Sequence, residues 1–364
     1  MKLAILVDQP HWTGIGLYAL ELYNSVRPYV EDIKLFYLGA VKDDFPNSQI
    51  IGYVKHATHL LARPLIIRNN YNRLLNDGTY KDYLFHFVGT DFFGVGKRPG
   101  IMTVHDVIKD RFLTLNNLNP KKALGELERI RKYSSALNVA NDAIAIISIS
   151  ERTRNELKRL TGLDSEVIYH WIEDEKFTTR DADQCLQKLG LDKNYSYILS
   201  VGNDRPNKRI DLIEAFSNSL PSQYKLIKIG STINSLNCIN MGQVSDELYP
   251  FYFNAAKAYL HLSDDEGFGR PLIEALGSEI PVICRDTEIN NELLGNASII
   301  ISDTVNESHV KKVIEKLENS SVSYDLAEKI QLRKKLFKKR SIINKYLALY
   351  VDSWSYFLKG KNIE

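Results

Sequence analysis

Cysteine is scarce in this chain, and long apolar runs are absent. The 364 residues include only three cysteines, Cys185, Cys238 and Cys284, and none forms a Cys-x-x-Cys pair. This pattern argues against a disulfide scaffold and a thiolate zinc site, and it indicates a reducing compartment. No apolar stretch approaches the roughly 18 residues of a membrane-spanning helix, and the first apolar run is too short for a signal peptide. We therefore expect a cytoplasmic protein.

Neither sign of charge dominates the composition. The 47 Lys and Arg residues nearly balance the 45 Asp and Glu residues, which leaves a net charge of +2. A nucleic-acid-binding domain normally carries a basic excess, so we expect no nucleic-acid partner. The hydrophobic content of 44% is typical of a globular protein, and 364 residues suit two domains better than one.

Short apolar segments alternate with amphipathic ones along the chain. This alternation predicts an α/β protein whose parallel sheets are covered by helices on both faces. The expected strands cover residues 3–7, 33–38, 83–88, 101–104 and 143–147 in a first series, and 197–201, 225–229, 258–262 and 281–284 in a second.

Two glutamates bracket a glycine-rich turn after the expected strand 258–262. Gly267 and Gly269 allow the backbone to approach a ligand closely, and Pro271 fits the first turn of a following helix. The start of that helix favours an anion. Glu266 in the loop and Glu274 in the first helical turn would accept hydrogen bonds from sugar hydroxyls. The segment therefore predicts a ligand that carries both phosphate and sugar.

The same segment resembles the Glu-x7-Glu signature of retaining glycosyltransferases of sequence family 4. Every fixed position of the family pattern is filled, from Glu266 to Ala275. The resemblance implies two Rossmann-like domains that face each other across a cleft, the GT-B fold, with a C-terminal helix that crosses back to the first domain. We expect an acceptor domain over residues 1–170 plus 345–364 and a donor domain over residues 171–344.

Two cations follow the first expected strand of the second series. Arg205 and Lys208 come after Gly202, in a loop at a helix start, where ligands of parallel sheets bind. They would neutralise a diphosphate, although solvated surface charge is the alternative. The resemblance implies that Arg205 and Lys208 hold the donor diphosphate and stabilise the leaving group. It further implies that Glu266 and the backbone of Gly267, Phe268 and Gly269 hold the transferred sugar. Glu274 would hold the ribose, and Val244 would lie near the base.

A histidine ends the expected strand 101–104. His105 resembles the family histidine that faces the donor sugar, and Asp106 would orient it. A neutral imidazole could bond a sugar hydroxyl or the transition-state charge, although a lone histidine at a strand end is usually structural.

Gly14 and Gly16 fit the dinucleotide fingerprint Gly-x-Gly-x-x-Ala. Six residues separate them from the preceding strand, however, and no acid ends the next strand, so we expect no nicotinamide or flavin. The segment resembles the family loop that borders the diphosphate and the acceptor. His11 and Trp12 would contact an acceptor sugar.

We expect neither a cofactor nor a catalytic metal. Asp181-Ala182-Asp183 resembles a metal-binding Asp-x-Asp, but it opens a helix, so capping explains it better. A departure from the family is Glu279, which stands where a glycine is usual. We expect that turn to be rearranged or its backbone not to be left-handed.

Two basic segments raise the question of membrane contact. Residues 55–75 contain His59, Arg63, Arg68 and Arg73 among long apolar residues, and residues 333–340 are polybasic. Each segment is either a peripheral membrane surface or a solvated helix face.

These observations favour a retaining, metal-independent transfer of a hexose from a UDP- or GDP-sugar to an acceptor hydroxyl on a glycan, a lipid-linked acceptor or a small molecule. Three alternatives stay open: a nucleotide-sugar epimerase or phosphorylase of the same fold, a non-catalytic sugar-nucleotide-binding or scaffold protein, and a membrane-surface adaptor.

Overall fold

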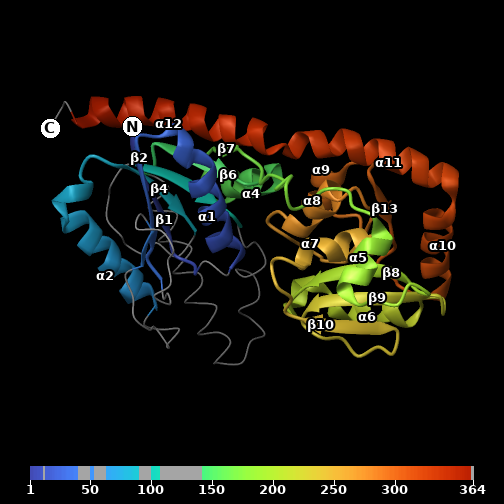
Figure 1. Cartoon of the computed structure of the whole chain (residues 1–364). Helices are drawn as coiled ribbons and strands as arrows, with labels where there is room; N and C mark the ends of the chain where they lie inside the picture. Colours follow the sequence, from blue (N-terminus) through green and yellow to red (C-terminus); the bar gives the residue numbers. More distant parts are fainter. Residues whose placement is uncertain (11–12, 40–49, 53–62, 90–99, 107–141, 362–364) are drawn as a thin grey trace, which may run out of the picture. The chain divides into compact units, whose positions relative to one another are not determined.

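The computed structural model describes residues 1–10, 13–39, 50–52, 63–89, 100–106 and 142–361. They form two compact units (Figure 1), one of Met1–Tyr169 with Ile342–Glu364 and one of His170–Ser341. No helix among these residues is both long and apolar enough to cross a bilayer.

The first unit is built on a seven-stranded parallel sheet. The strand order is β3-β2-β1-β4-β5-β6-β7, with every described pair parallel. The strands expected from the sequence are confirmed with small shifts at their ends, whereas the short edge strands β3 and β7 were not predicted. The bounds are β1 Lys2–Val7, β2 Asp32–Tyr37, β3 Ile50–Gly52, β4 Leu84–Val88, β5 Gly100–Val104, β6 Ala145–Ser148 and β7 Glu166–Val167, with α1 Gly14–Val26, α2 Arg63–Asn76 and α4 Glu151–Thr161.

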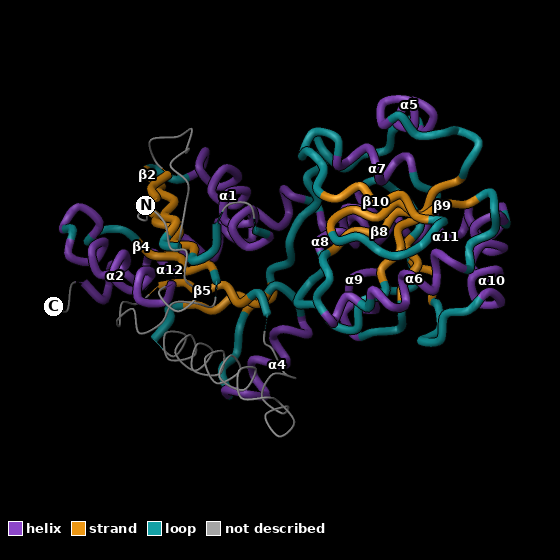
Figure 2. Tube along the Cα trace, turned by 90° about the horizontal axis from the view of Figure 1, so that it is seen from below, coloured by secondary structure: helices purple, strands orange, loops and turns teal. Residues whose placement is uncertain are grey.

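The second unit is built on a six-stranded parallel sheet. Its order is β10-β9-β8-β11-β12-β13, and Figure 2 shows the strands as a layer between helices. Strands β10 and β13 lie at the two edges of the sheet and were not predicted. The bounds are β8 Ser196–Gly202, β9 Tyr224–Gly230, β10 Cys238–Gly242, β11 Ala258–His261, β12 Val282–Cys284 and β13 Ser298–Ile300, with α5 Ala182–Leu189, η4 Pro206–Lys208, α6 Ile210–Asn218, α7 Tyr249–Ala255, α8 Arg270–Gly277, α9 Glu288–Leu294, α10 Glu307–Glu318, α11 Ser320–Lys334 and η5 Lys335–Phe337.

Two local features of the second unit follow from residue chemistry. Asp181 caps α5 by accepting a hydrogen bond from the Gln184 N–H at 2.8 Å, which confirms the capping prediction. Of the two expectations for Glu279, the one that its backbone is not left-handed is wrong, because its φ is 59°. The turn satisfies the last carbonyls of α8, and Lys334 compensates for the strained residue by bonding its carboxylate at 3.0 Å and the Gly277 carbonyl at 2.9 Å.

The C-terminal helix α12 (Lys339–Lys361) packs on the first unit through buried tyrosines. The hydroxyls of Tyr346 and Tyr18 share a hydrogen bond, and the Tyr350 hydroxyl lies 2.8 Å from Nδ1 of His86. Nε2 of His86 lies 2.7 Å from the Thr103 hydroxyl, so both ring nitrogens have partners. Burial, with a smaller effect of His105, lowers the pKa of His86 to about 3, so the imidazole is neutral. The predicted return of this helix to the first domain is confirmed.

This buried network makes the helix sensitive to a single oxygen atom. Tyr350→Phe leaves Nδ1 of His86 without its hydroxyl partner, so we expect a loss of about 1–2 kcal/mol in unfolding free energy, measured in urea. Tyr356→Phe on the same helix is the matched control, because Tyr356 is exposed and its loss should change nothing measurable. Equal stability of the two variants would show that the buried bond contributes no net stability.

Candidate active site

The predicted site residues of the second unit lie where parallel strands end. Lys208 belongs to η4 after strand β8, and Glu266 belongs to the loop after strand β11, which pairs with β8. The structure brings the two together in an ion pair between Nζ of Lys208 and Oε1 of Glu266. Two residues that lie 58 positions apart in the sequence therefore meet at the carboxyl-terminal ends of the strands, where ligands of such folds bind.

The surroundings of Glu266 keep its carboxylate ionised. Burial alone would raise the pKa of this group, since only 14% of the side chain is exposed. The attraction of Lys208 opposes burial, with further help from His261 and a hydrogen bond from Ser263, and the pKa lies below its ordinary value. Nε2 of His261 lies 3.9 Å from Oε1 of Glu266, and burial lowers the pKa of this imidazole to about 4. The contact therefore joins the Glu266 carboxylate to Lys208, beside the neutral imidazole of His261.

Glu274 lies in α8 beside a tyrosine. It is the fifth residue of the helix, so the prediction of the first turn is wrong by one position. The Tyr249 hydroxyl donates a hydrogen bond of 2.8 Å to Oε2, and Nε of Arg270 lies 3.9 Å from Oε1. The helix begins after Gly269, whose φ of +89° and close approach to Leu272 exclude a side chain there.

The ring of Phe268 is buried in the second unit. It is 3% exposed and packs on His170 and Phe337, with ring centroids 4.8 and 6.2 Å away. The ring therefore belongs to the core of the second unit, and it fixes the loop that carries Glu266.

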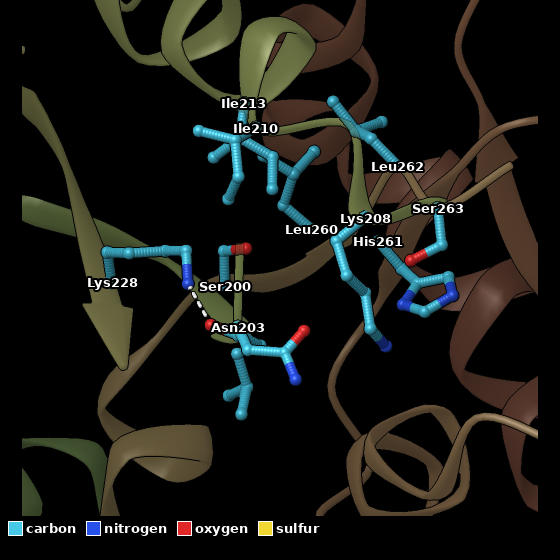
Figure 3. A pocket seen from close by; sticks show the side chains of 12 residues that line it. Ser200, Asn203, Lys208, Ile210, Ile213, Lys228, Leu260, His261, Leu262 and Ser263 are labelled. Atoms are coloured by element: carbon cyan, nitrogen blue, oxygen red, sulfur yellow. Dashed lines mark hydrogen bonds between the residues drawn. The ribbon is translucent and has the colours of Figure 1, made fainter. Parts of the chain in front are cut away.

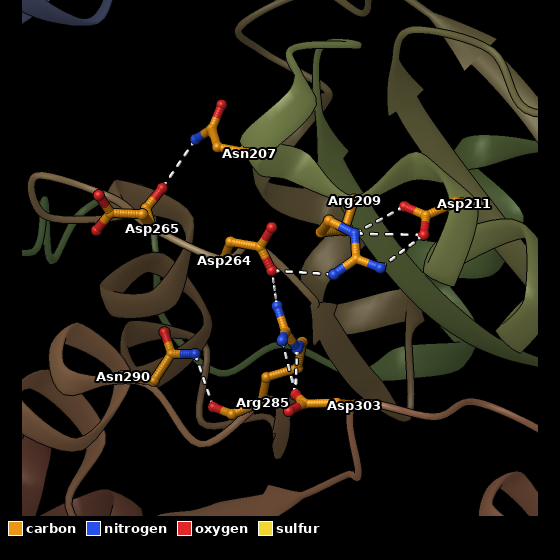
Figure 4. A network of polar contacts seen from close by, with 8 residues as sticks. All are labelled: Asn207, Arg209, Asp211, Asp264, Asp265, Arg285, Asn290 and Asp303. Atoms are coloured by element: carbon orange, nitrogen blue, oxygen red, sulfur yellow. Dashed lines mark hydrogen bonds and ion pairs between the residues drawn. The ribbon is translucent and has the colours of Figure 1, made fainter. Parts of the chain in front are cut away.

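The loop after β11 is also fastened to η4. The Asp264 N–H donates to the Asn207 carbonyl at 2.8 Å, and the Asn207 side chain donates to the Asp265 carbonyl at 2.8 Å. Arg209 and Arg285 both bond the Asp264 carboxylate (Figure 4). These contacts fix the two segments that carry Lys208 and Glu266 relative to each other. The sequence analysis missed them because each contact joins distant segments.

A small pocket lies beside the Lys208–Glu266 pair (Figure 3). Gly202 and Lys208 line it, as do three residues that the sequence analysis did not single out: Lys228, His261 and Ser263. Arg205 precedes Lys208 and is exposed, with its N–H bonded to the Asn203 side chain at 3.3 Å. Lys228 stands between Ile227 and Ile229 in β9, and a lysine flanked by apolar residues in a strand is a signal in the sequence that could have drawn attention to it.

Val244 belongs to another loop of the second unit. It is half-buried in the loop that follows β10, at the carboxyl end of the same sheet. Its predicted role at the base stays a prediction.

The other predicted residues belong to the first unit. His105 follows β5, is 6% exposed and meets the ring of Tyr18 edge-on, with centroids 4.8 Å apart. Gly14 and Gly16 are the first and third residues of α1, so this segment is a helix start, capped by Thr13 through a 3.1 Å bond from the Gly16 N–H. Asp106 directly follows His105 and is half-buried, whereas His11 and Trp12 lie outside the described residues.

The basic segments are partly structural. Ile67, Tyr71 and Leu74 of α2 pack in the core of the first unit, while Arg68 and Arg73 are exposed; Lys55 and His59 lie outside the described residues. In the polybasic run, Arg333 bonds the carbonyls of Glu292 and Leu293, Lys334 bonds Glu279, and Lys339 bonds Glu173. The exposed cations of the run are Lys335, Lys338 and Arg340.

Known proteins resemble this chain in sequence and in fold. Residues 181–336 match the family model described as glycosyl transferases group 1. The chain is 26% identical to O-antigen chain mannosyltransferase B of Escherichia coli over 352 residues, which cover 85% of this chain and 88% of that protein.

Solved structures share the fold of this chain. HepE of Anabaena, in complex with UDP and glucose, has a TM-score of 0.75 at 16% identity, over 97% of this chain and 100% of that one. WaaG, a glycosyltransferase involved in lipopolysaccharide biosynthesis, has a TM-score of 0.73 at 15% identity, over 94% of this chain and 98% of that one. The predicted class of two Rossmann-like α/β domains is confirmed.

Proposed function

We propose that this chain is a glycosyltransferase, because residues 181–336 of the second unit match the group 1 glycosyltransferase model and a mannosyltransferase is 26% identical over most of the chain. It transfers a hexose from a nucleotide-diphosphate sugar to an acceptor hydroxyl, with retention of configuration and without a metal. The observation that carries the proposal is the contact of Lys208 with Glu266. A cation that can bind phosphate and a carboxylate that can bind sugar hydroxyls meet at the carboxyl-terminal ends of two neighbouring strands.

The donor groups divide into a leaving-group side and a sugar side. Arg205 and Lys208 neutralise the diphosphate as the bond between the anomeric carbon and the phosphate oxygen breaks. Glu266 and the backbone of Gly267, Phe268 and Gly269 hold the sugar. A new bond forms from the anomeric carbon to the acceptor oxygen on the same face, and the acceptor proton moves to the departing phosphate. Positioning and electrostatic stabilisation then supply most of the rate.

The nucleotide binds further along α8. The Tyr249 hydroxyl occupies one oxygen of Glu274 and so orients the carboxylate, whose other oxygen accepts hydrogen bonds from the ribose. Burial, with the nearby Glu274 as a further cause, raises the pKa of Tyr249 well above its ordinary value, so this hydroxyl stays a donor. Val244 lines the base pocket.

The first unit provides the acceptor side. His105 faces the donor sugar as a hydrogen-bonding imidazole with Asp106 beside it, and Gly14 and Gly16 border the diphosphate. The acceptor is a glycan hydroxyl, supported by the name of the Escherichia coli relative, an O-antigen chain mannosyltransferase. Peripheral contact with a membrane would use the exposed cations Lys335, Lys338 and Arg340.

The proposal is tested by thermal shift with UDP, GDP, ADP and their common hexose conjugates, in buffer containing EDTA. One nucleotide is expected to raise the Tm of the wild type by several degrees, because a ligand of the native state stabilises it. Glu274→Ala and Arg205→Ala should lose this shift. Glu247→Ala is the matched control, because its carboxylate is exposed in the same unit.

The alternatives give different results. Absence of any shift in the folded wild type would reject the nucleotide-sugar site and favour the adaptor. Binding without transfer or hydrolysis of any donor would favour the scaffold protein. Inversion of the anomeric configuration in the released sugar, followed by NMR, would contradict retention, and a shift that requires added Mg²⁺ would contradict metal independence.

A further inference from the structure

Three hydrogen-bond donors converge on one backbone carbonyl at the end of strand β8. The Gly202 oxygen accepts from Nζ of Lys228 at 2.6 Å, from the Ser231 N–H at 3.1 Å and from the Ser231 hydroxyl at 3.3 Å. The approach is tight, since a Cβ on Gly230 would lie 2.3 Å from this oxygen. Such a set of contacts fixes the plane of the peptide that joins Gly202 to Asn203.

Lys228 occupies an unusual position for a lysine. It lies in β9 between Ile227 and Ile229 and is 1% exposed, and its second bond is to the Ile229 carbonyl at 3.0 Å. A buried ammonium costs stability unless neighbours compensate for its lost hydration. Stability alone would therefore favour an apolar side chain at this point of the strand.

The fixed peptide plane determines the direction of the next N–H. In a trans peptide the carbonyl and the N–H point to opposite sides, and no described bond is cis. Because the Gly202 carbonyl faces the β9 side, the Asn203 N–H faces the β11 side of β8. Among the backbone bonds of the described turns, loops and caps, none uses this N–H.

Polar side chains of the site gather on the β11 side. Lys208, His261 and Ser263 line the same pocket as Asn203 and Lys228. In Figure 3 the Lys228 ammonium reaches the loop from β9, and the Lys208 side chain lies beyond Asn203. An N–H aimed at this region is placed to meet an anion that Lys208 also contacts.

We propose that Lys228 is a positioning residue, which holds the Gly202 carbonyl so that the Asn203 N–H is presented to the donor diphosphate beside Lys208. The inference rests on the proposed function, because it assigns the diphosphate to this loop. A donor that is already aimed at developing charge needs no reorganisation during the reaction, so its fixed direction favours both binding and transfer. Without the ammonium, the peptide is held by Ser231 alone.

The test compares two lysines of the same strand by calorimetric titration with UDP, GDP and ADP. Lys228→Met is expected to weaken binding of the nucleotide that binds the wild type by about tenfold or more, at an unchanged or higher Tm. Lys225→Met is the matched control, because Lys225 is also in β9 but lies over the ring of Tyr195 and does not line the pocket. Its loss should leave the Kd unchanged. Lys228→Gln, which keeps a donor without the charge, should give an intermediate Kd.

A pH series separates positioning from a merely structural role. Burial, with a smaller effect of Lys208, lowers the pKa of Lys228 to about 8, and Cys238 of β10 opposes this shift. The wild type should therefore bind the nucleotide more weakly as the pH rises through about 8, and Lys228→Met should lose this step. The weaker binding follows because a neutral amine makes a weaker bond to the carbonyl than an ammonium.

Each outcome decides the inference. Equal Kd values for Lys228→Met and the wild type would overturn it and leave the proposed function intact. A lower Tm that accompanies the weaker binding of both Lys228→Met and Lys228→Gln would also overturn it, in favour of a structural role. Failure of the wild type to bind any of the three nucleotides would overturn the proposed function and the inference together.

Discussion

Glu266→Gln is expected to lower turnover about a hundredfold or more without weakening nucleotide binding. The substitution preserves the shape of the side chain but removes the charge that faces the transferred sugar and its developing positive charge. It also releases Lys208 from its ion pair, which leaves the ammonium free for the diphosphate. The Kd for UDP or GDP should therefore stay the same or decrease, while the kcat for sugar transfer or for slow donor hydrolysis falls.

A loss of turnover together with unchanged or tighter nucleotide binding makes this result specific to Glu266. Glu247→Gln removes an exposed carboxylate of the same unit and should change neither quantity. Parallel losses of binding and turnover in Glu266→Gln, with no change in stability, would mean that Glu266 holds the nucleotide and not the sugar. Full turnover would remove Glu266 from the catalytic groups.

Lys208→Met is expected to destabilise the protein by about 2–3 kcal/mol and to abolish nucleotide binding. The substitution leaves the Glu266 carboxylate, 14% exposed, without its cation, and an unpaired buried charge is costly. The wild-type pKa of Glu266 is lowered, so its stabilising effect is present above the ordinary carboxyl pKa and disappears in acid. In the variant, burial raises this pKa instead. The deficit relative to the wild type should therefore shrink as the pH falls below about 5.

Urea unfolding at several pH values checks this expectation. The double variant Lys208→Met/Glu266→Gln should recover most of the lost stability, because neither buried charge remains, yet it should still fail to bind nucleotide. Lys329→Met breaks an exposed ion pair with Asp325 and should cost less than about 0.5 kcal/mol. If Lys208→Met cost no more than this control, the pair would have no role in stability.

The sequence by itself determined the elements and the segments that carry the chemistry. Mainly apolar runs of four to six residues marked most strands, because a strand buried on both faces is mostly apolar. The spacing of Glu266, Gly269 and Pro271 predicted a loop followed by a helix start, which the structure has. The cap at Asp181 was equally local. The edge strands β3, β7 and β13 escaped prediction because they have only two or three residues. Strand β10 escaped because none of its five residues is fully buried and Asn240 interrupts its apolar positions.

Only the tertiary structure decided which side chains meet. The pairing of Lys208 with Glu266, the bond from Tyr249 to Glu274 and the bond from Lys228 to Gly202 join segments that lie 58, 25 and 26 positions apart. No local periodicity encodes such contacts, because they depend on strand order and on where each strand ends. Sequence patterns could predict a site for an anion and a sugar at the carboxyl-terminal ends of these strands. The charge balance of the site and the direction of its backbone N–H donors follow from packing.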